Sequence, residues 1–108
     1  MGVSKTDQFS VAQNHLANMA KAIAHPARIA ILEHLFKINT CVCGDIVEEI
    51  GLAQATISQH LKALKEAGLI KGNTDGTKVC YCIDTENMGK LSVILSRFFA
   101  SGCSTDCC

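Results

Sequence analysis

Four cysteines share one spacing and are the residues of this chain best suited to chemistry. Cys41 and Cys43 lie two positions apart in TCVCGDI, and Cys80 and Cys82 repeat that spacing in VCYCI. Thiolates bind soft or borderline ions such as Zn, Cd, Cu(I) and As(III), and paired thiols can also be oxidised to a disulfide. The alternative is that each cysteine is a small buried apolar residue. Two matching pairs favour a thiol site over that packing role.

Strand geometry decides whether the two pairs can share one site. Alternation places Cys41 and Cys43 on one face of an extended segment, and Cys80 and Cys82 on one face of another. The expected core side of the second segment holds its three other large residues, Val79, Tyr81 and Ile83. If the two segments pair with all four thiols outward, opposed Cβ atoms stand about 4.5–5.5 Å apart, within reach of one soft ion. The opposite arrangement, with Cys41 and Cys43 toward the core, stays open.

Three further cysteines, Cys103, Cys107 and Cys108, stand at the C-terminal end of the sequence. They would complete a metal site if this tail folds back, or they would be exposed thiols open to oxidation. The start, MGVSKTDQFS, is polar and contains no apolar signal segment. A high cysteine count without such a segment predicts a cytoplasmic protein with reduced thiols rather than a secreted disulfide framework.

The elements that must position these residues follow from periodicity and breaker residues. The 108 residues suit one domain, and an apolar content of 48% with 19% charged residues indicates a globular chain without a membrane span. Hydrophobic spacing predicts helices at about 11–24, 26–37, 46–50, 53–67 and 86–100. Two β-type runs near 69–71 and 78–83, joined by GNTDG, predict a hairpin.

This order of elements predicts a mainly α fold with a small β wing. We expect a winged helix-turn-helix, built from five helices plus a β-hairpin, over residues 11–101. A flexible N-terminal tail, 1–10, precedes it and a cysteine-containing C-terminal tail, 102–108, follows it. The last helix is apolar over more than one stripe, which a small monomer cannot bury, and so it predicts a subunit contact.

The helix expected at 53–67 has the side chains needed to read DNA. Its apolar stripe of Ile57, Leu61 and Leu64 should be buried, leaving short polar groups that donate and accept hydrogen bonds in a major groove. The candidate DNA-binding residues are Gln54, Ala55, Thr56, Ser58, Gln59, His60, Lys62, Lys65 and Lys78, with Lys71 beside them. The chain carries equal numbers of basic and acidic residues, so any basic surface must be local. The alternative is an ordinary solvated helix face; the tight turn before it and the hairpin after it favour DNA binding.

The stretch DIVEEIGLAQATISQHLKALKEAGLIKG resembles the helix-turn-helix of the ArsR/SmtB repressors, which are bacterial metal-sensing transcription factors. HPARIAIL and VCYCID resemble that family too, and the likeness extends over about residues 12–100. It implies a homodimer that binds double-stranded operator DNA and releases it when a metal or metalloid ion, As(III), Cd or Zn, binds; no obligatory cofactor is implied. The first and last helices would supply the dimer contacts: Leu16, Leu91, Ile94, Leu95, Phe98 and Phe99.

The segment TCVCGDI resembles the arsenic and cadmium box of that family, Leu-Cys-Val-Cys-Asp, with one difference. Gly44 separates the second cysteine from the acid, so Cys41 and Cys43 are displaced by one position, which in a strand exchanges the two faces. A thiol redox or persulfide-sensing repressor of the same fold is therefore a second hypothesis. A soft-metal-buffering thiol protein with no DNA role is a third.

The sequence does not indicate an enzyme, since it has no nucleophile with an evident histidine partner and no phosphate-cradling glycine loop. We also expect no membrane partner and no small organic substrate.

Overall fold

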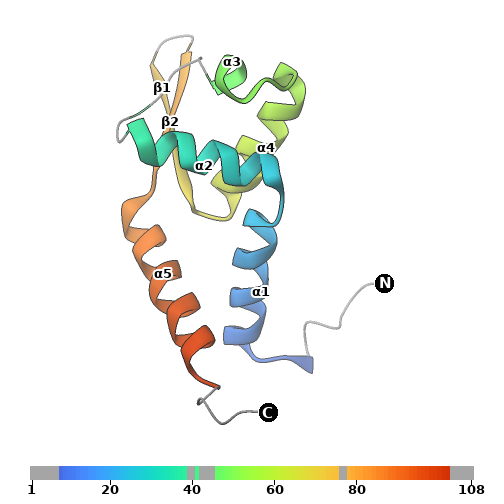
Figure 1. Cartoon of the computed structure of the whole chain (residues 1–108), viewed down its shortest axis with the longest axis vertical. Coiled ribbons are helices and arrows are strands. Elements are labelled where there is room, and N and C mark those ends of the chain that lie inside the picture. The colour runs from blue at the N-terminus through green and yellow to red at the C-terminus, as the bar shows by residue number, and fades with distance from the viewer. Residues whose placement is uncertain (1–7, 39–40, 42–45, 76–77, 103–108) are drawn as a thin grey trace.

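The computed structural model describes residues 8–38, 41, 46–75 and 78–102. Within these residues the chain forms five helices and one two-stranded antiparallel sheet. In order they are α1 (Val11–Ile23), α2 (Pro26–Ile38), α3 (Ile46–Ile50), α4 (Gln54–Glu66), β1 (Ile70–Asp75), β2 (Lys78–Ile83) and α5 (Thr85–Ala100). Figure 1 shows α3, α4 and the hairpin at one end of the molecule, with α1 and α5 extending together toward the other. This is the architecture that the sequence predicts.

The junction between α1 and α2 is set by local hydrogen bonds. Ser10 and Gln13 form a reciprocal capping box at the start of α1, with distances of 2.9 and 3.0 Å. Proline lacks an N–H and suits a first helical turn, so α2 begins at Pro26. His25 Nδ1 accepts a hydrogen bond from the Ala27 N–H at 3.0 Å. The His25 side chain thus caps the start of α2.

Two glycines with left-handed backbone conformations bound α4. Gly51 has φ 80° in the short turn after α3, and Gly68 has φ 83° just after α4 ends. Such angles strain residues that carry a Cβ, so glycine fixes both boundaries. The Leu69 N–H then donates to the Leu64 carbonyl at 3.0 Å and turns the chain into β1.

The hairpin formed by β1 and β2, the wing, has a continuous register. Ile70 pairs with Ile83, and Gly72 pairs with Tyr81. Tyr81 and Ile83 pack against the core as predicted, but Val79 is 43% exposed, so its expected place in the core is wrong. Val79 stands nearer the turn of the hairpin than the other two residues do, where the wing leaves the helices.

The first turn of α5 is hydrogen-bonded to the turn between α4 and β1. Asp84 caps α5, since its Oδ1 accepts from the Asn87 N–H at 3.1 Å. Asn87 Nδ2 donates to the Gly68 carbonyl at 2.9 Å, and the Asp84 N–H donates to the Leu69 carbonyl at 3.0 Å. These bonds connect α5 directly to the helix-turn-helix.

The core is one apolar cluster to which all five helices and β1 contribute. Its most deeply buried large side chains are Ile31, Leu35, Ile57, Leu64 and Leu69. Leu91 also belongs to it and is only 3% exposed, so the expectation that Leu91 forms a dimer contact is wrong. Helix α5 turns this residue toward its own chain because α1 and α5 contact each other. None of the described helices is long and apolar enough to cross a membrane.

Candidate DNA-reading surface and thiol pair

Helix α4 presents a polar surface because its apolar stripe is fully used by the core. Ile57, Leu61 and Leu64 are at most 5% exposed. The exposed residues are Gln54, Ala55, Thr56, Ser58, Gln59, Lys62, Lys65 and Glu66. Apart from Glu66 they are the predicted DNA-binding residues of this helix, and all of them are accessible. That they contact DNA stays a prediction.

His60 is the exception on this helix. Only 8% of it is exposed, and its Nδ1 accepts a hydrogen bond of 3.1 Å from Arg28 Nε. Its ring lies 4.4 Å from the ring of His25. The expectation that His60 faces DNA is therefore wrong, because the side chain turns inward and joins α4 to the start of α2.

Burial and two neighbouring side chains disfavour the charged form of His60. Desolvation lowers the pKa of His60 below its ordinary value of 6.5, and the nearby His25 and Arg28 lower it further. Arg28 is positioned by a second bond, from its Nη1 to the Ala22 carbonyl at 3.1 Å. Sequence reasoning overlooked Arg28; its signal was its place three residues after His25, in the first turn of the following helix.

The wing continues the exposed surface of α4. A Cβ placed on Gly72 would lie 3.2 Å from Lys65 Nζ and 3.3 Å from Tyr81 Cε1, so the lysine ammonium reaches the base of the wing. Lys71 is exposed on β1, and Lys78 begins β2. Cations at these positions would suit phosphate contacts, which fix the register of a protein on a duplex without reading sequence.

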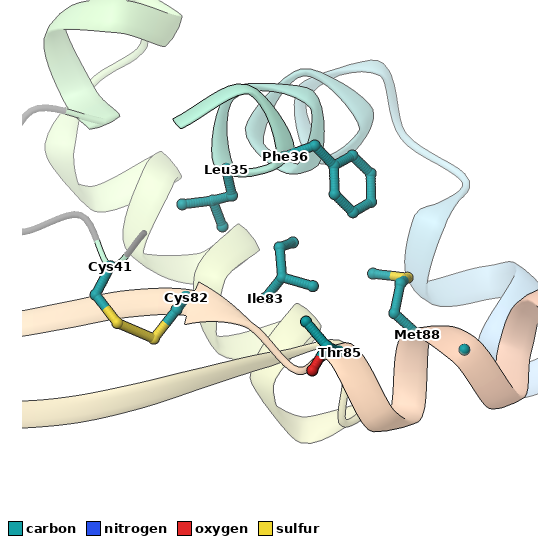
Figure 2. A pocket seen from close by; sticks show the side chains of 8 residues that line it. Leu35, Phe36, Cys41, Cys82, Ile83, Thr85 and Met88 are labelled. Atoms are coloured by element: carbon teal, nitrogen blue, oxygen red, sulfur yellow. A yellow bond between two sulfur atoms is a disulfide. The ribbon is translucent and has the colours of Figure 1, made fainter. Parts of the chain in front are cut away.

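The structure brings together one cysteine from each Cys-x-Cys pair. Cys41 and Cys82, which are 41 positions apart in sequence, form a disulfide with their Cα atoms 4.3 Å apart (Figure 2). Cys41 is exposed and Cys82 is half-buried. Cys80 is disulfide-bonded as well. The other predicted ligands, Cys43, Cys103, Cys107 and Cys108, lie outside the described residues.

Among the described residues, the cysteine thiols are the right kind of donor for a soft ion, but there are too few of them to complete a site. Reduced Cys41 and Cys82 would supply two thiolates, whereas a closed zinc site takes four ligands and As(III) takes three. In the part of the chain that the structure describes, no three His, Cys, Asp or Glu side chains gather closely enough to hold a metal ion.

The remaining dimer candidates lie along α1 and α5. Leu16, Ile94 and Leu95 are half-buried, whereas Phe98 and Phe99 are 58% and 73% exposed. The two phenylalanine rings contact each other edge to face, with centroids 5.5 Å apart. They form an apolar patch at the end of α5 far from the wing (Figure 1).

Three features define a winged helix-turn-helix regulator. The helices pack around one apolar core, an exposed polar helix follows a tight turn, and a hairpin lies beside that helix. The family model of the bacterial regulatory proteins of the arsR family matches residues 25–71. The chain is 32% identical over 84 residues to the uncharacterised HTH-type transcriptional regulator Rv0081 of Mycobacterium tuberculosis, covering 78% of this chain and 74% of that protein. The chain therefore belongs to the arsR family and is a transcriptional regulator.

Three further comparisons agree with this assignment. The HTH-type transcriptional repressor SmtB of M. tuberculosis is 40% identical over 63 residues, which is 58% of this chain and 46% of the repressor. The crystal structure of Rv0081 superposes with a TM-score of 0.66 at 29% identity, covering 85% of this chain and 92% of that one. A homodimeric winged helix-turn-helix domain from Mycobacterium bovis, solved by NMR, has the same fold, with a TM-score of 0.65 at 23% identity and coverage of 100% and 95%.

Proposed function

We propose that this regulator is a homodimeric repressor that binds operator DNA through α4 and the wing and releases it when the Cys41–Cys82 pair is oxidised. The observation that carries the proposal is the disulfide itself. It joins the segment between α2 and α3 to the second strand of the wing, across 41 positions of sequence. The pair therefore links the segment that leads into the helix-turn-helix to the wing.

DNA recognition would divide between base-reading and phosphate-binding residues. Gln54, Ser58 and Gln59 are exposed on the first half of α4, where a recognition helix contacts base edges. Lys62, Lys65 and Lys71 lie farther along α4 and on β1, where their charges suit phosphate. The repressor SmtB among the relatives supports repression as the outcome of binding.

Release requires that the two thiol states favour different shapes. A disulfide allows only one spacing between Cys41 and Cys82, whereas two thiols tolerate many. Because α3 contacts α4 and α4 contacts β1, a tether at this point constrains the helix-turn-helix relative to the wing. The reduced protein would then be free to adopt the shape that fits an operator. A switch of this kind works only through its difference in DNA affinity between the two states.

The test is DNA binding by reduced and oxidised protein. A duplex is first obtained by in vitro selection with the reduced protein, and its affinity is then measured by fluorescence anisotropy before and after oxidation by hydrogen peroxide. We expect oxidation to weaken binding at least tenfold and a reductant to restore it. Cys41→Ser and Cys82→Ser should both bind tightly whether or not oxidant is present, since each removes one half of the same bond.

Other results would contradict the proposal in distinct ways. If no duplex is selected at any salt concentration, the repressor assignment fails and a metal-buffering protein becomes the better description. If the DNA affinity is the same in both thiol states, the repressor stands but its control by this pair does not. Replacing Lys62 by Ala should lower the dependence of binding on salt, as loss of a phosphate contact does, without changing the preferred sequence.

A second candidate function keeps the same fold and replaces oxidation by a soft ion. The observation in its favour is that the Cα atoms of Cys41 and Cys82 lie 4.3 Å apart, so the two reduced thiolates can approach one ion together. Two donors do not complete a site, and further ligands would have to come from elsewhere in the chain. Titration of the reduced protein with As(III), Cd(II) or Zn(II) under argon tests it. DNA release by one of these ions, lost in Cys41→Ser, would favour the ion over oxidation.

A further inference from the structure

A pocket of about 470 Å³ lies beside the Cys41–Cys82 bond. Figure 2 shows the disulfide at one end of it and Phe36 and Met88 at the other, with Ile83 between them. The lining comes from α2, from Cys41 beyond it, from β2 and from the first turns of α5: Leu35, Phe36, Cys41, Cys82, Ile83, Thr85, Met88 and Gly89. This volume lies within the range of small-molecule sites in proteins.

The side chains that line the pocket favour a neutral, apolar ligand. Leu35, Phe36, Ile83 and Met88 provide the walls, and the described lining contains no charged side chain; Thr85 supplies its only hydroxyl. A charged oxidant would lose hydration there without gaining a partner. An apolar group would instead leave water and contact the carbon atoms of the walls.

The pocket lies apart from the exposed phenylalanines at the end of α5. Gly89 and Phe98 are nine residues apart on α5, which at 1.5 Å per residue separates them by roughly 13 Å. The pocket therefore lies away from the exposed pair Phe98 and Phe99 along α5.

We propose that this pocket binds the organic part of an organic hydroperoxide and presents its O–O bond to the Cys41–Cys82 thiols. The proposal rests on the redox function above and names its oxidant. Hydrogen peroxide, which has no apolar part, gains nothing from these walls. The pocket makes the thiol pair selective for apolar peroxides.

The chemistry balances with this one oxidant. The thiolate of one cysteine attacks the hydroperoxide, the O–O bond breaks, and a sulfenic acid forms as an alcohol leaves. The thiol of the other cysteine then attacks the sulfenic sulfur, the disulfide forms and water leaves. Two thiols and one hydroperoxide thus give one disulfide, one alcohol and one water. The sulfurs lose two electrons to the peroxide.

A substitution at Gly89 can test whether the oxidant uses the pocket. A Cβ built at this residue meets no heavy atom within 4 Å, so a larger side chain can enter without a clash. Because Gly89 lines the pocket, we expect Gly89→Leu to occupy part of the cavity. Gly89→Ala is the matched control because it changes the helix in the same way and adds only a methyl group. Thr85→Leu, at an exposed lining position, is a second filling variant should Gly89→Leu fail to fold.

The experiment measures the oxidation rate of fully reduced protein by cumene hydroperoxide and by hydrogen peroxide. Formation of the Cys41–Cys82 bond is followed by alkylation and peptide mass spectrometry, and both rates are divided by those of N-acetylcysteine. We expect cumene hydroperoxide to be preferred roughly tenfold, the effect of burying about two methylene groups. Gly89→Leu should lose this preference and keep its hydrogen peroxide rate, whereas Gly89→Ala should behave as the unaltered protein does.

The possible failures separate the two proposals. If hydrogen peroxide forms the bond and releases DNA but cumene hydroperoxide is not preferred, the pocket proposal is wrong and the redox function stands. A preference that survives in both Gly89→Leu and Thr85→Leu also overturns it, because the oxidant would then not use the pocket. If neither peroxide forms the bond, the redox function fails and the pocket proposal fails with it.

Discussion

At the scale of single residues, the hydrogen bond between Arg28 and His60 joins α4 to the start of α2. His60 lies on α4, the helix proposed to read DNA, yet its Nδ1 is used inside the molecule, where Arg28 Nε donates to it. Arg28 also holds the Ala22 carbonyl. One side chain therefore connects the end of α1, the start of α2 and the middle of α4.

Replacing Arg28 by Ala should lower the free energy of unfolding by about 2 kcal/mol. The substitution leaves a buried imidazole nitrogen without its donor, and an unpaired buried polar group costs roughly 1–3 kcal/mol. Urea unfolding followed by circular dichroism measures the change. Lys37→Ala, which removes an exposed cation from the same helix, should change stability by less than about 0.5 kcal/mol. Equal losses in the two variants would contradict a specific role for Arg28.

His60 should also make stability depend on pH. Its pKa in the folded protein is lowered by burial and by the charges of His25 and Arg28, so the unfolded chain binds the proton more readily. The free energy of unfolding should therefore fall as pH drops below about 6.5, and the loss should be complete below the folded-state pKa. His60→Asn keeps an acceptor for Arg28 but cannot titrate, so its stability should change less between about pH 7.5 and about pH 5.5. Parallel pH profiles for the two proteins would show that His60 is not responsible.

At the scale of elements, two glycines make the helix-turn-helix possible for different reasons. Gly51 and Gly68 both have positive φ angles, but their surroundings differ. A Cβ on Gly51 would meet no atom within 4 Å, whereas one on Gly68 would lie 3.0 Å from Asn87 Nδ2. The turn before α4 needs glycine for its backbone alone. The turn after α4 needs it also for the contact with α5.

Gly51→Ala should cost about 1 kcal/mol of stability, the strain of a left-handed residue with a Cβ. Gly68→Ala should cost more, about 2 kcal/mol, because it also displaces Asn87 from its bond to the Gly68 carbonyl. Asn87→Ala should then lower the free energy of unfolding less in the Gly68→Ala variant than it does in the unaltered protein. Additive losses in this double-mutant cycle would show that the two residues do not interact.

At the scale of the whole molecule, the Cys41–Cys82 bond closes a large loop. With 41 positions between its ends, the chain-entropy estimate of its stabilisation is about 4 kcal/mol. Oxidised Cys41→Ser should therefore unfold at lower urea concentration than the oxidised unaltered protein, by up to this amount. In the presence of reductant the two proteins should unfold together. A difference that persists under reductant would mean that the serine itself is destabilising.

The exposed end of α5 should determine assembly. Phe98→Ser or Phe99→Ser should weaken dimerisation at least tenfold, because each symmetric contact would lose the burial of two aromatic rings. Sedimentation velocity over a range of concentrations measures the monomer–dimer equilibrium. Val79→Ser removes an exposed apolar residue from the wing and should leave that equilibrium unchanged. If this variant weakens the dimer equally, the subunit contact lies elsewhere.

The fold was accessible from sequence because its signals are local. Pro26, Gly51, Gly68 and Asp84 each act on the backbone within a few residues, and the predicted helices begin and end within two residues of the observed ones. Apolar spacing likewise identified Ile57, Leu61 and Leu64 as the buried stripe of α4.

The predicted turn GNTDG lies largely within β1, which extends to Asp75, and the expected reduced thiols form a disulfide. The other errors concern the orientation of a side chain relative to distant elements. His60 turns toward Arg28, which is 32 positions away, Leu91 turns into the core, and Val79 leaves it. Helical or strand periodicity gives the angle between residues of one element. It contains no information about which neighbour that element packs against.

By itself, the sequence determined that this chain is a winged helix-turn-helix regulator with thiols at two places. Caps, breakers and apolar periodicity act locally and leave few alternative folds. Only the tertiary structure decided that Cys41 meets Cys82 beside an apolar pocket. Contact between residues 41 positions apart depends on how α2, β2 and α5 pack together, and no local pattern encodes that packing.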